Sequence, residues 1–355
     1  MENAVRSRLQ SVQLAEPQIY KTIVIVPLIA PADGTFQYRT LSEALATPDV
    51  AITEISSAGS VPDLMVVNRG NQSVLLIDGE ELAGAKQNRV LNTSILLKET
   101  SETKIPVSCT EQGRWAYTSK AFSESGHVMA YKTRSRKTRS VHSSLLASAQ
   151  YKSDQGEVWA GIAHLQAQAC APSPTHAMSD VYKARENDLR KCDEIFKPVA
   201  NQIGLLAFIG GTPAGADLVS LTAAYAKLHP KLVRSYTLEG LIDNAPSPHG
   251  EGQGELPASP PQGEVAPADY SALAKAFLDE IASSEERQFP SVGYGTDFRY
   301  RSGPPHSPLA TAHSIAGTAL VHENEVIHAA FFRLDETDQA APMASYRSRF
   351  RRFTQ

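Results

Sequence analysis

Short apolar runs rich in valine, isoleucine and threonine recur through the first third of the chain, and glycine or asparagine separates several of them. Such runs are typical of β-strands, because branched side chains pack well on a pleated surface. Residues 68–72 lie between two of the runs and have the composition of a short hairpin loop. The pattern predicts strands at Ile19–Ile29, Ala51–Ile55, Leu64–Asn68, Ser73–Ile77, Val90–Leu97 and Thr103–Cys109.

The apolar positions take a helical spacing in the middle of the chain. Residues 156–169 carry them on one helix face, and a second helix is expected to begin near Ser179 and to end near Pro198. Residues 119–143 precede these helices and are polar and basic, which predicts an exposed, mobile loop. Its most basic part contains Lys132, Arg134, Arg136, Lys137 and Arg139.

The last third of the chain mixes strand and helix patterns. Pro230 lies inside one predicted helix and is expected to bend or split it. Residues 244–268 are rich in proline, glycine, glutamate and glutamine; they cannot bury enough apolar surface to fold and predict a disordered insertion. The predicted elements are strands at 202–210 and 216–219, helices at 221–242 and 271–283, and a hairpin at 317–322 and 325–333.

This sequence of blocks predicts an α+β fold. Its N-terminal half is β-rich (19–118), its middle is helical (141–199), and its C-terminal part (200–335) mixes strands and helices around the disordered insertion. Residues 1–18 are expected to form an N-terminal extension, and residues 336–355 a basic tail.

Composition narrows the functional classes. The chain has 355 residues, 42% of them hydrophobic and 20% charged, which is ordinary for a globular protein. A formal net charge of -4 disfavours a nucleic-acid-coating protein. The three cysteines are widely spaced and form no CxxC pair, so neither a zinc ribbon nor a disulfide framework is indicated. We find no signal peptide and no apolar segment long enough to cross a membrane, which predicts a cytoplasmic protein.

A dense polar segment follows the predicted strand at 73–77. Glu80 and Glu81 are candidate acid/base groups or metal ligands, since a carboxylate in a dry pocket can carry protons near neutral pH. Adjacent residues of a strand point to opposite faces, so only one of the two is expected to face a pocket. Side chains suited to an anionic, hydrogen-bonding ligand follow at Lys86, Asn88, Arg89 and Asn92. The alternative is a solvated hairpin tip with internal ion pairs, which contribute little.

A second polar segment follows the predicted strand that ends at Cys109. Glu111 offers an acid, Gln112 an amide and Arg114 an anion clamp, while Trp115 could stack on a base or a sugar. Alternatively, Trp115 is a core anchor and Arg114 belongs to a structural ion pair. Cys109 has no histidine nearby in the sequence, which favours a buried structural cysteine over a nucleophile. Polar segments at two strand ends predict one shared pocket.

Several motifs resemble a prokaryotic family. They are Val66–Gly70, Leu75–Leu82, Gly84–Thr93, Ile105–Cys109 with Glu111–Trp115, and Phe289–Gly293. The family they resemble is the ADP-ribosylglycohydrolase- and rhodanese-phosphatase-superfamily-associated protein domain, and the resemblance spans roughly residues 19 to 335. It implies a part in ADP-ribose, NAD or phosphoester metabolism. It implies no established reaction and no agreed catalytic residues.

We therefore expect the chain to bind a nucleotide or an ADP-ribose-type ligand that contains phosphate, and hydrolysis would use Glu80, Glu81 or Glu111 to act on water. The alternative is a non-catalytic binding or scaffold component of an ADP-ribosylation or stress-response system, with a protein partner. A further alternative is an RNA-associated protein that uses the basic segment 132–139 and the basic tail, although the net charge disfavours nucleic acid. The sequence identifies no cofactor, and its histidines show no metal-ligand spacing.

Overall fold

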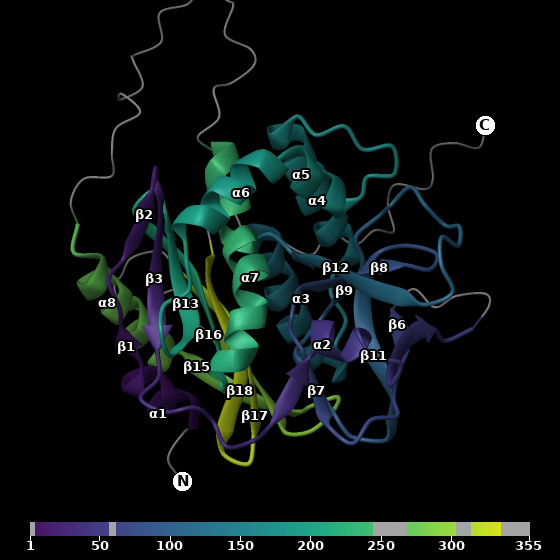
Figure 1. The fold of residues 1–355 in the computed structure, drawn as a ribbon, viewed down its shortest axis with the longest axis horizontal. Helices are drawn as coiled ribbons and strands as arrows, with labels where there is room; N and C mark the ends of the chain where they lie inside the picture. Colours follow the sequence, from purple (N-terminus) through teal and green to yellow (C-terminus); the bar gives the residue numbers. More distant parts are fainter. Residues whose placement is uncertain (1–3, 57–61, 244–267, 303–313, 335–355) are drawn as a thin grey trace, which may run out of the picture.

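The computed structural model describes residues 4–56, 62–243, 268–302 and 314–334 (Figure 1). The predicted basic tail and almost all of the predicted insertion at 244–268 lie outside these residues. Within them the fold is α+β with a β-rich N-terminal half, which confirms the predicted class. None of the described helices is both long enough and apolar enough to cross a membrane.

A nine-stranded antiparallel sheet forms the centre of the molecule. Its order is β1-β3-β13-β14-β18-β17-β16-β15, and β2 pairs with β3 outside this path. Side chains of β3 alternate between the two faces, so that Ile23 and Ile25 enter one core and Val24 and Val26 the other. The strands are β1 (Gln13–Leu14), β2 (Gln18–Tyr20), β3 (Ile23–Ile29), β13 (Gln202–Ile209), β14 (Thr212–Val219), β15 (Glu285–Pro290), β16 (Thr296–Arg301), β17 (Ser314–His322) and β18 (Glu325–Leu334).

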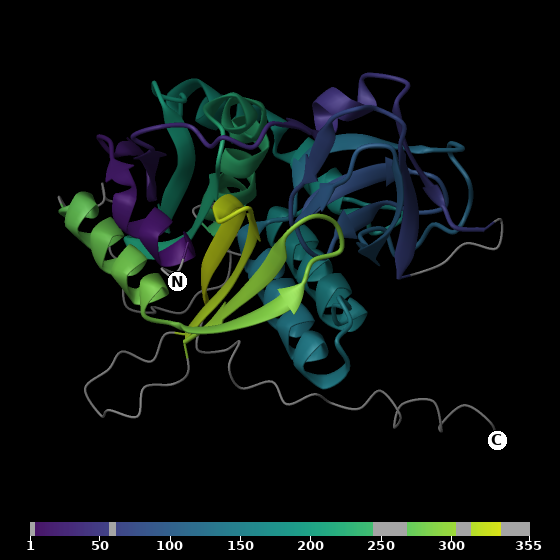
Figure 2. The same cartoon turned by 90° about the horizontal axis from the view of Figure 1, so that it is seen from below.

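Helices cover both faces of this sheet (Figures 1 and 2). Helices α1 (Ala4–Ser11) and α8 (Tyr270–Ala282) pack on one face, and α3 (Tyr131–Ser148) and α7 (Thr222–Asp243) pack on the other. The apolar residues of α1 are buried against the sheet and β1 pairs with β3, so described residues of the predicted N-terminal extension pack on this sheet. Helix α7 continues through Pro230, so the predicted split is wrong.

A second unit is formed by residues 38–128 and lies beside the central sheet (Figure 2). It has a six-stranded sheet of order β12-β8-β9-β11-β6-β5 and a three-stranded sheet of order β10-β7-β4. Strands β5 and β12, at the two ends of the larger sheet, also contact each other, so this sheet curls around an apolar core. The elements are β4 (Tyr38–Thr40), α2 (Leu41–Leu45), β5 (Val50–Glu54), β6 (Asp63–Asn68), β7 (Ser73–Leu76), β8 (Glu80–Gly84), β9 (Arg89–Leu91), β10 (Ile95–Leu97), β11 (Ser101–Cys109) and β12 (Phe122–Val128).

Two segments that were predicted to be loops have a different structure. Strands β6 and β7 lie in different sheets, so residues 68–72 connect two sheets and do not form a hairpin. The basic segment 132–139 is not an exposed loop but part of α3, with Arg134 and Lys137 fully buried. Cations on the inward face of a helix produce no apolar periodicity, which explains the wrong prediction. Helices α4 (Gln155–Ala169), α5 (Met178–Ala184) and α6 (Glu186–Ile195) complete the middle of the chain.

Candidate functional site

The pairing of β8, β9 and β11 divides the predicted site residues between two faces of the curled sheet. Arg89 is opposite Leu82 on β8 and opposite Cys109 on β11, whereas Glu81 is opposite Val90. Residues directly opposite each other share a face, and neighbours along a strand lie on opposite faces. We therefore call the face that carries Arg89 and the apolar core the inner face, and the face that carries Glu81 the outer face.

On the inner face, Arg89 is buried with unused hydrogen-bonding capacity. Its Nη1 donates to Oε1 of Gln87 at 2.7 Å and contacts Sγ of Cys109 at 2.9 Å. Its Nη2 lies 3.8 Å from Oε1 of Glu54, whose side chain is only 3% exposed. Nε and Nη2 of Arg89 and both carboxylate oxygens of Glu54 have no hydrogen-bond partner among the described residues. Buried charged groups are costly without such partners, so this pair could hold a polar ligand or water.

Aromatic side chains lie next to this pair. The guanidinium carbon of Arg89 is 5.6 Å from the ring centre of Trp115. Nζ of Lys86 lies 5.3 Å from the same ring and 5.2 Å from the ring of Tyr117. Trp115 is 49% exposed and Tyr117 is 51% exposed, so Trp115 is not a core anchor. Cations beside partly exposed rings form a surface that can stack on another flat group.

On the outer face, Glu81 is a buried carboxyl group with one unpartnered oxygen. Its Oε1 accepts a hydrogen bond of 2.7 Å from Oγ1 of Thr110, while its Oε2 has no partner among the described residues. Burial raises the pKa of Glu81 to about 7, against the opposing effect of the hydrogen bond from Thr110 and of the nearby hydroxyl of Ser125. A carboxyl group with this pKa can take up and release a proton near neutral pH.

Glu80 has different partners and takes part in a buried ion cluster. Nζ of Lys231, on α7, contacts the carboxylates of both Glu80 and Glu124. The second oxygen of Glu80 accepts the backbone N–H of Ile77 at 3.2 Å. Burial raises the pKa of Glu80, and the charge of Lys231 opposes that shift. These contacts give Glu80 a structural role that connects the second unit to α7.

Arg114 joins the two predicted polar segments. Its guanidinium lies 2.6 Å from Oε2 of Glu111, and it donates to the carbonyl of Ala85 at 2.7 Å and to Oδ1 of Asn88 at 3.1 Å. Burial alone would raise the pKa of Glu111, but hydrogen bonds from Arg114 and Thr175 hold it below its usual value. The guanidinium of Arg114 is therefore already bound by groups of the protein. This favours the structural ion pair over the anion clamp.

The remaining predicted residues differ in their environments. Asn92 accepts a hydrogen bond of 2.6 Å from Oγ of Ser108 and donates one of 2.9 Å to the carbonyl of Tyr151. Gln112 is exposed. The two polar segments therefore meet, through Arg114 and through Trp115, but their side chains are divided between two faces of the sheet instead of one pocket. Among the described residues, no group of three or more histidine, cysteine, aspartate or glutamate side chains could hold a metal ion.

Sequence reasoning missed a buried charge network between the second unit and the central sheet. Arg134 of α3 donates to both carboxylate oxygens of Asp217 on β14, at 3.0 and 2.8 Å, and to Asp78 at 3.1 Å. Lys137 contacts the other oxygen of Asp78. Burial lowers the pKa of Lys137 to about 8, although the charge of Asp78 opposes the shift. All four side chains are fully buried.

The network continues along the same face of the sheet. Oδ1 of Asp217 lies 3.4 Å from Nε2 of His328, whose Nδ1 is 2.7 Å from Oγ of Ser94. Farther along, Asp297 and Arg299 of β16 pair with each other and both bond to Thr93. Because these side chains are buried, the network's evident role is to fix the second unit on the central sheet. A cationic helix face beside buried acidic strand positions is the signal that could have revealed it.

Comparison with protein families places most of the chain within one domain. The ARG and Rhodanese-Phosphatase-superfamily-associated Protein domain (ARPP-1) matches residues 11–332. The chain belongs to this family. The ARPP-1 domain includes both faces of the curled sheet and the buried network, and it starts earlier than the resemblance from residue 19. The family name does not state what the abbreviation ARG stands for, so the connection to ADP-ribosylglycohydrolase stays a prediction. The comparisons with curated proteins and with solved structures gave no match.

Proposed function

We propose that the chain binds a nucleotide or ADP-ribose-type ligand at the inner face of the curled sheet. The observation that supports this is the buried Arg89–Glu54 pair, whose unpartnered hydrogen-bonding atoms lie next to the half-exposed ring of Trp115. Phosphate oxygens would accept hydrogen bonds from Arg89, and a ribose hydroxyl would donate to Glu54. A base would stack on Trp115. One ligand class therefore offers a partner for each of these groups.

Lys86 and Tyr117, which lie beside Trp115 at the edge of this site, suit the same ligand. The ammonium group of Lys86 adds positive charge beside Trp115 and Tyr117, and it attracts a phosphate-bearing molecule. Glu54 was not among the residues predicted from sequence, but it follows Ile52 on the inward-facing positions of β5. The family description, which refers to a phosphatase superfamily, is compatible with a phosphate-containing ligand.

Tryptophan fluorescence provides a direct test. The chain has two tryptophans, so Trp159→Phe leaves Trp115 as the single reporter. Titration with ADP-ribose, NAD or AMP should change the fluorescence of Trp115 and raise the melting temperature. Tyr117→Ala removes a half-exposed ring and Lys86→Met removes the buried charge beside it; each should weaken binding several-fold, whereas Arg287→Met, on β15, should not. No response of fluorescence or melting temperature to these ligands would refute the proposal and favour the scaffold alternative.

Hydrolysis is a second candidate function because Glu81 combines a pKa of about 7 with an unpartnered oxygen. Glu81 lies on the outer face, so a ligand held by Arg89 would not contact it. Incubation with each ligand and chromatography of the products separates the two functions. A hydrolase would form product that Glu81→Gln abolishes, while binding alone gives a Trp115 response and no product. The RNA alternative loses part of its basis, because Arg134 and Lys137 are buried in α3, and the basic tail lies outside the described residues.

A further inference from the structure

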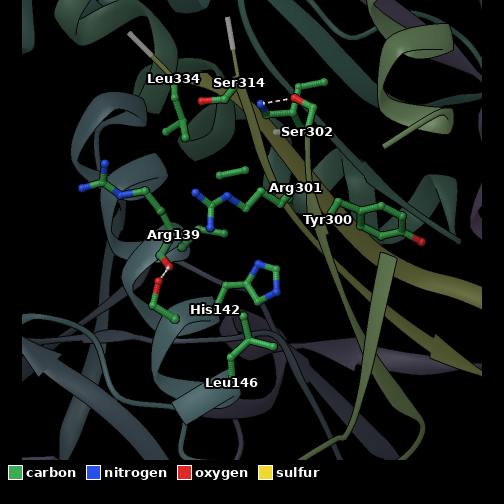
Figure 3. A pocket seen from close by; sticks show the side chains of 13 residues that line it. Arg139, His142, Leu146, Tyr300, Arg301, Ser302, Ser314 and Leu334 are labelled. Carbon is green, nitrogen blue, oxygen red and sulfur yellow. Dashed lines mark hydrogen bonds between the residues drawn. The ribbon is translucent and has the colours of Figure 1, made fainter. Parts of the chain in front are cut away.

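A separate cavity of about 200 Å³ lies between α3 and the C-terminal strands (Figure 3). Helix α3 supplies one wall, and β16 and β17 supply the other. The cavity is remote in sequence from the Arg89–Glu54 pair, and it shares no lining residue with that site. Its polar lining consists of Thr138, Arg139, His142, Ser143, Tyr300, Arg301, Ser302 and Ser314.

The charge of this lining is positive. Arg139 and Arg301 line the cavity, and no aspartate or glutamate does so among the described residues. Nη2 of Arg139 is paired with Glu157 at 3.0 Å. Arg301 is exposed, makes no ion pair with any described residue, and extends from β16 toward α3 between Arg139 and His142 (Figure 3). The carboxylate of Glu285, opposite Arg301 on β15, is paired with Arg287. An unpaired guanidinium in a cavity that no carboxylate lines favours an anion.

His142 supplies an independent observation that indicates a ligand. Its side chain is only 7% exposed, it lines the cavity, and its Nε2 is buried with no hydrogen-bond partner among the described residues. Burial, together with the charges of Arg299 and Arg301, lowers the pKa of His142 to about 4. The ring is therefore neutral at pH 7, and the tautomer protonated at Nε2 can donate a hydrogen bond to an oxyanion.

Size and apolar contacts limit what can bind. Pockets for drug-sized ligands typically have volumes of roughly 300–1,000 Å³, so this cavity is too small for a whole dinucleotide. The apolar side chains of Leu146, Ile315 and Leu334 also line it and would contact a small organic body. We propose that the cavity binds a phosphate group, either as free phosphate or on a small phosphorylated metabolite, through Arg301 and Nε2 of His142. This site does not depend on the function proposed for the inner face.

Calorimetric titration of the full-length chain tests the proposal and distinguishes the two sources of phosphate. The full chain is needed because residues 303–313 and 335–355, which are next in sequence to the lining residues Ser302, Ser314 and Leu334, lie outside the described residues. The probes are inorganic phosphate, ribose 5-phosphate and, as an uncharged control, ribose, all at constant ionic strength. Both phosphate probes should bind and ribose should not. Tighter binding of ribose 5-phosphate would identify a phosphorylated metabolite, whereas equal affinity would identify free phosphate. No binding of either probe overturns the proposal.

Matched variants locate the binding. Arg301→Gln should weaken phosphate binding about tenfold or more, because it removes a charge-assisted hydrogen bond. Arg190→Gln alters an exposed arginine on α6, outside the cavity, and should leave affinity unchanged. His142→Phe keeps a ring that can pack against Phe289 but removes Nε2, and should also weaken binding. Equal affinity of Arg301→Gln and the unmodified chain would refute the site.

Nitrogen NMR of the histidine side chains gives a second readout that does not depend on Arg301. The chain has ten histidines, and the signal absent from His142→Phe identifies His142. Adding phosphate should shift the Nε2 resonance of His142. An unchanged resonance at saturating phosphate would show that the anion binds elsewhere and would overturn the assignment.

Discussion

The guanidinium of Arg134 donates two hydrogen bonds, of 3.0 and 2.8 Å, to the two carboxylate oxygens of Asp217, and neither side chain is exposed. The same guanidinium donates to Asp78 in the second unit at 3.1 Å. One arginine on α3 therefore connects the central sheet with the curled sheet. The charge on Arg134 holds the pKa of Asp217 well below its usual value, although burial alone would raise it. This contact should dominate the stability of the junction.

Asp217→Ala should lower the free energy of unfolding by about 3–5 kcal/mol, because it leaves the charge of Arg134 buried without its main partner. Urea unfolding of the variant and the unmodified chain measures this difference. Asp188→Ala is the control, since Asp188 pairs with Lys191 on the surface and should cost less than about 1 kcal/mol. A loss at Asp217 as small as that of the control would show that the network does not stabilise the junction.

Sequence patterns could predict those elements whose apolar side chains face a core. The apolar run of β3 identifies it as a strand, and the hairpin of β17 and β18 turns where predicted, at Glu323 and Asn324, both of which have positive φ. Asparagine adopts that conformation more readily than most residues. Strand β8 was missed because it carries two buried glutamates, and the partner of Glu80 on α7 is remote in sequence.

The candidate site was predictable only in part, for a similar reason. That the polar segments follow strand ends is visible from the sequence, and Arg114 joins them in space. Their division between two faces depends on the register of β8, β9 and β11, which pairs Arg89 with Cys109. Register is set by long-range pairing and is not encoded in any one segment. The proximity of Glu54 to Arg89 also requires the curled sheet, which brings β5 and β9 to the same core.

Lys231→Met should destabilise the chain by about 3–5 kcal/mol, because Glu80 would remain buried without its cation. The double variant Lys231→Met with Glu80→Gln should recover part of the loss, and urea unfolding of the four chains gives the coupling energy. Lys227→Met changes an exposed lysine on the same helix and should alter stability by only about 0.5 kcal/mol. No recovery in the double variant would mean that the loss at Lys231 arises from packing alone.

Thiol reactivity should differ sharply between the cysteines. Of the three cysteines, Cys170 is exposed, whereas Cys109 and Cys192 are buried. Burial raises the pKa of both buried thiols, so the reactive thiolate is scarce at pH 7. A coloured disulfide reagent should therefore label Cys170 quickly in the folded chain and the other two only after unfolding in urea. Cys170→Ser should remove the fast phase. Fast labelling that persists in this variant would show an accessible Cys109 or Cys192 and revive Cys109 as a nucleophile.

Glu81→Gln should stabilise the chain more at high pH than at low pH. The folded-state pKa of Glu81 is about 7, above the usual glutamate value of 4.5, so the folded state binds more protons between these values. Glu81 therefore reduces stability as pH rises through this window, and the full penalty is present above the folded-state pKa. Glutamine does not ionise and escapes the penalty. The stability difference between Glu81→Gln and the unmodified chain should grow by about 2 kcal/mol from near pH 5 to near pH 8.

Urea unfolding at both pH values measures this change, and any constant effect of replacing the hydrogen bond from Thr110 cancels in the comparison. Glu102→Gln provides the control, because Glu102 is an exposed carboxylate on β11 and its replacement should give the same small effect at both pH values. If the difference at Glu81 is equally independent of pH, the carboxyl group is solvated or paired in the folded chain. In that case Glu81 would also lose the property that makes it a candidate to activate water.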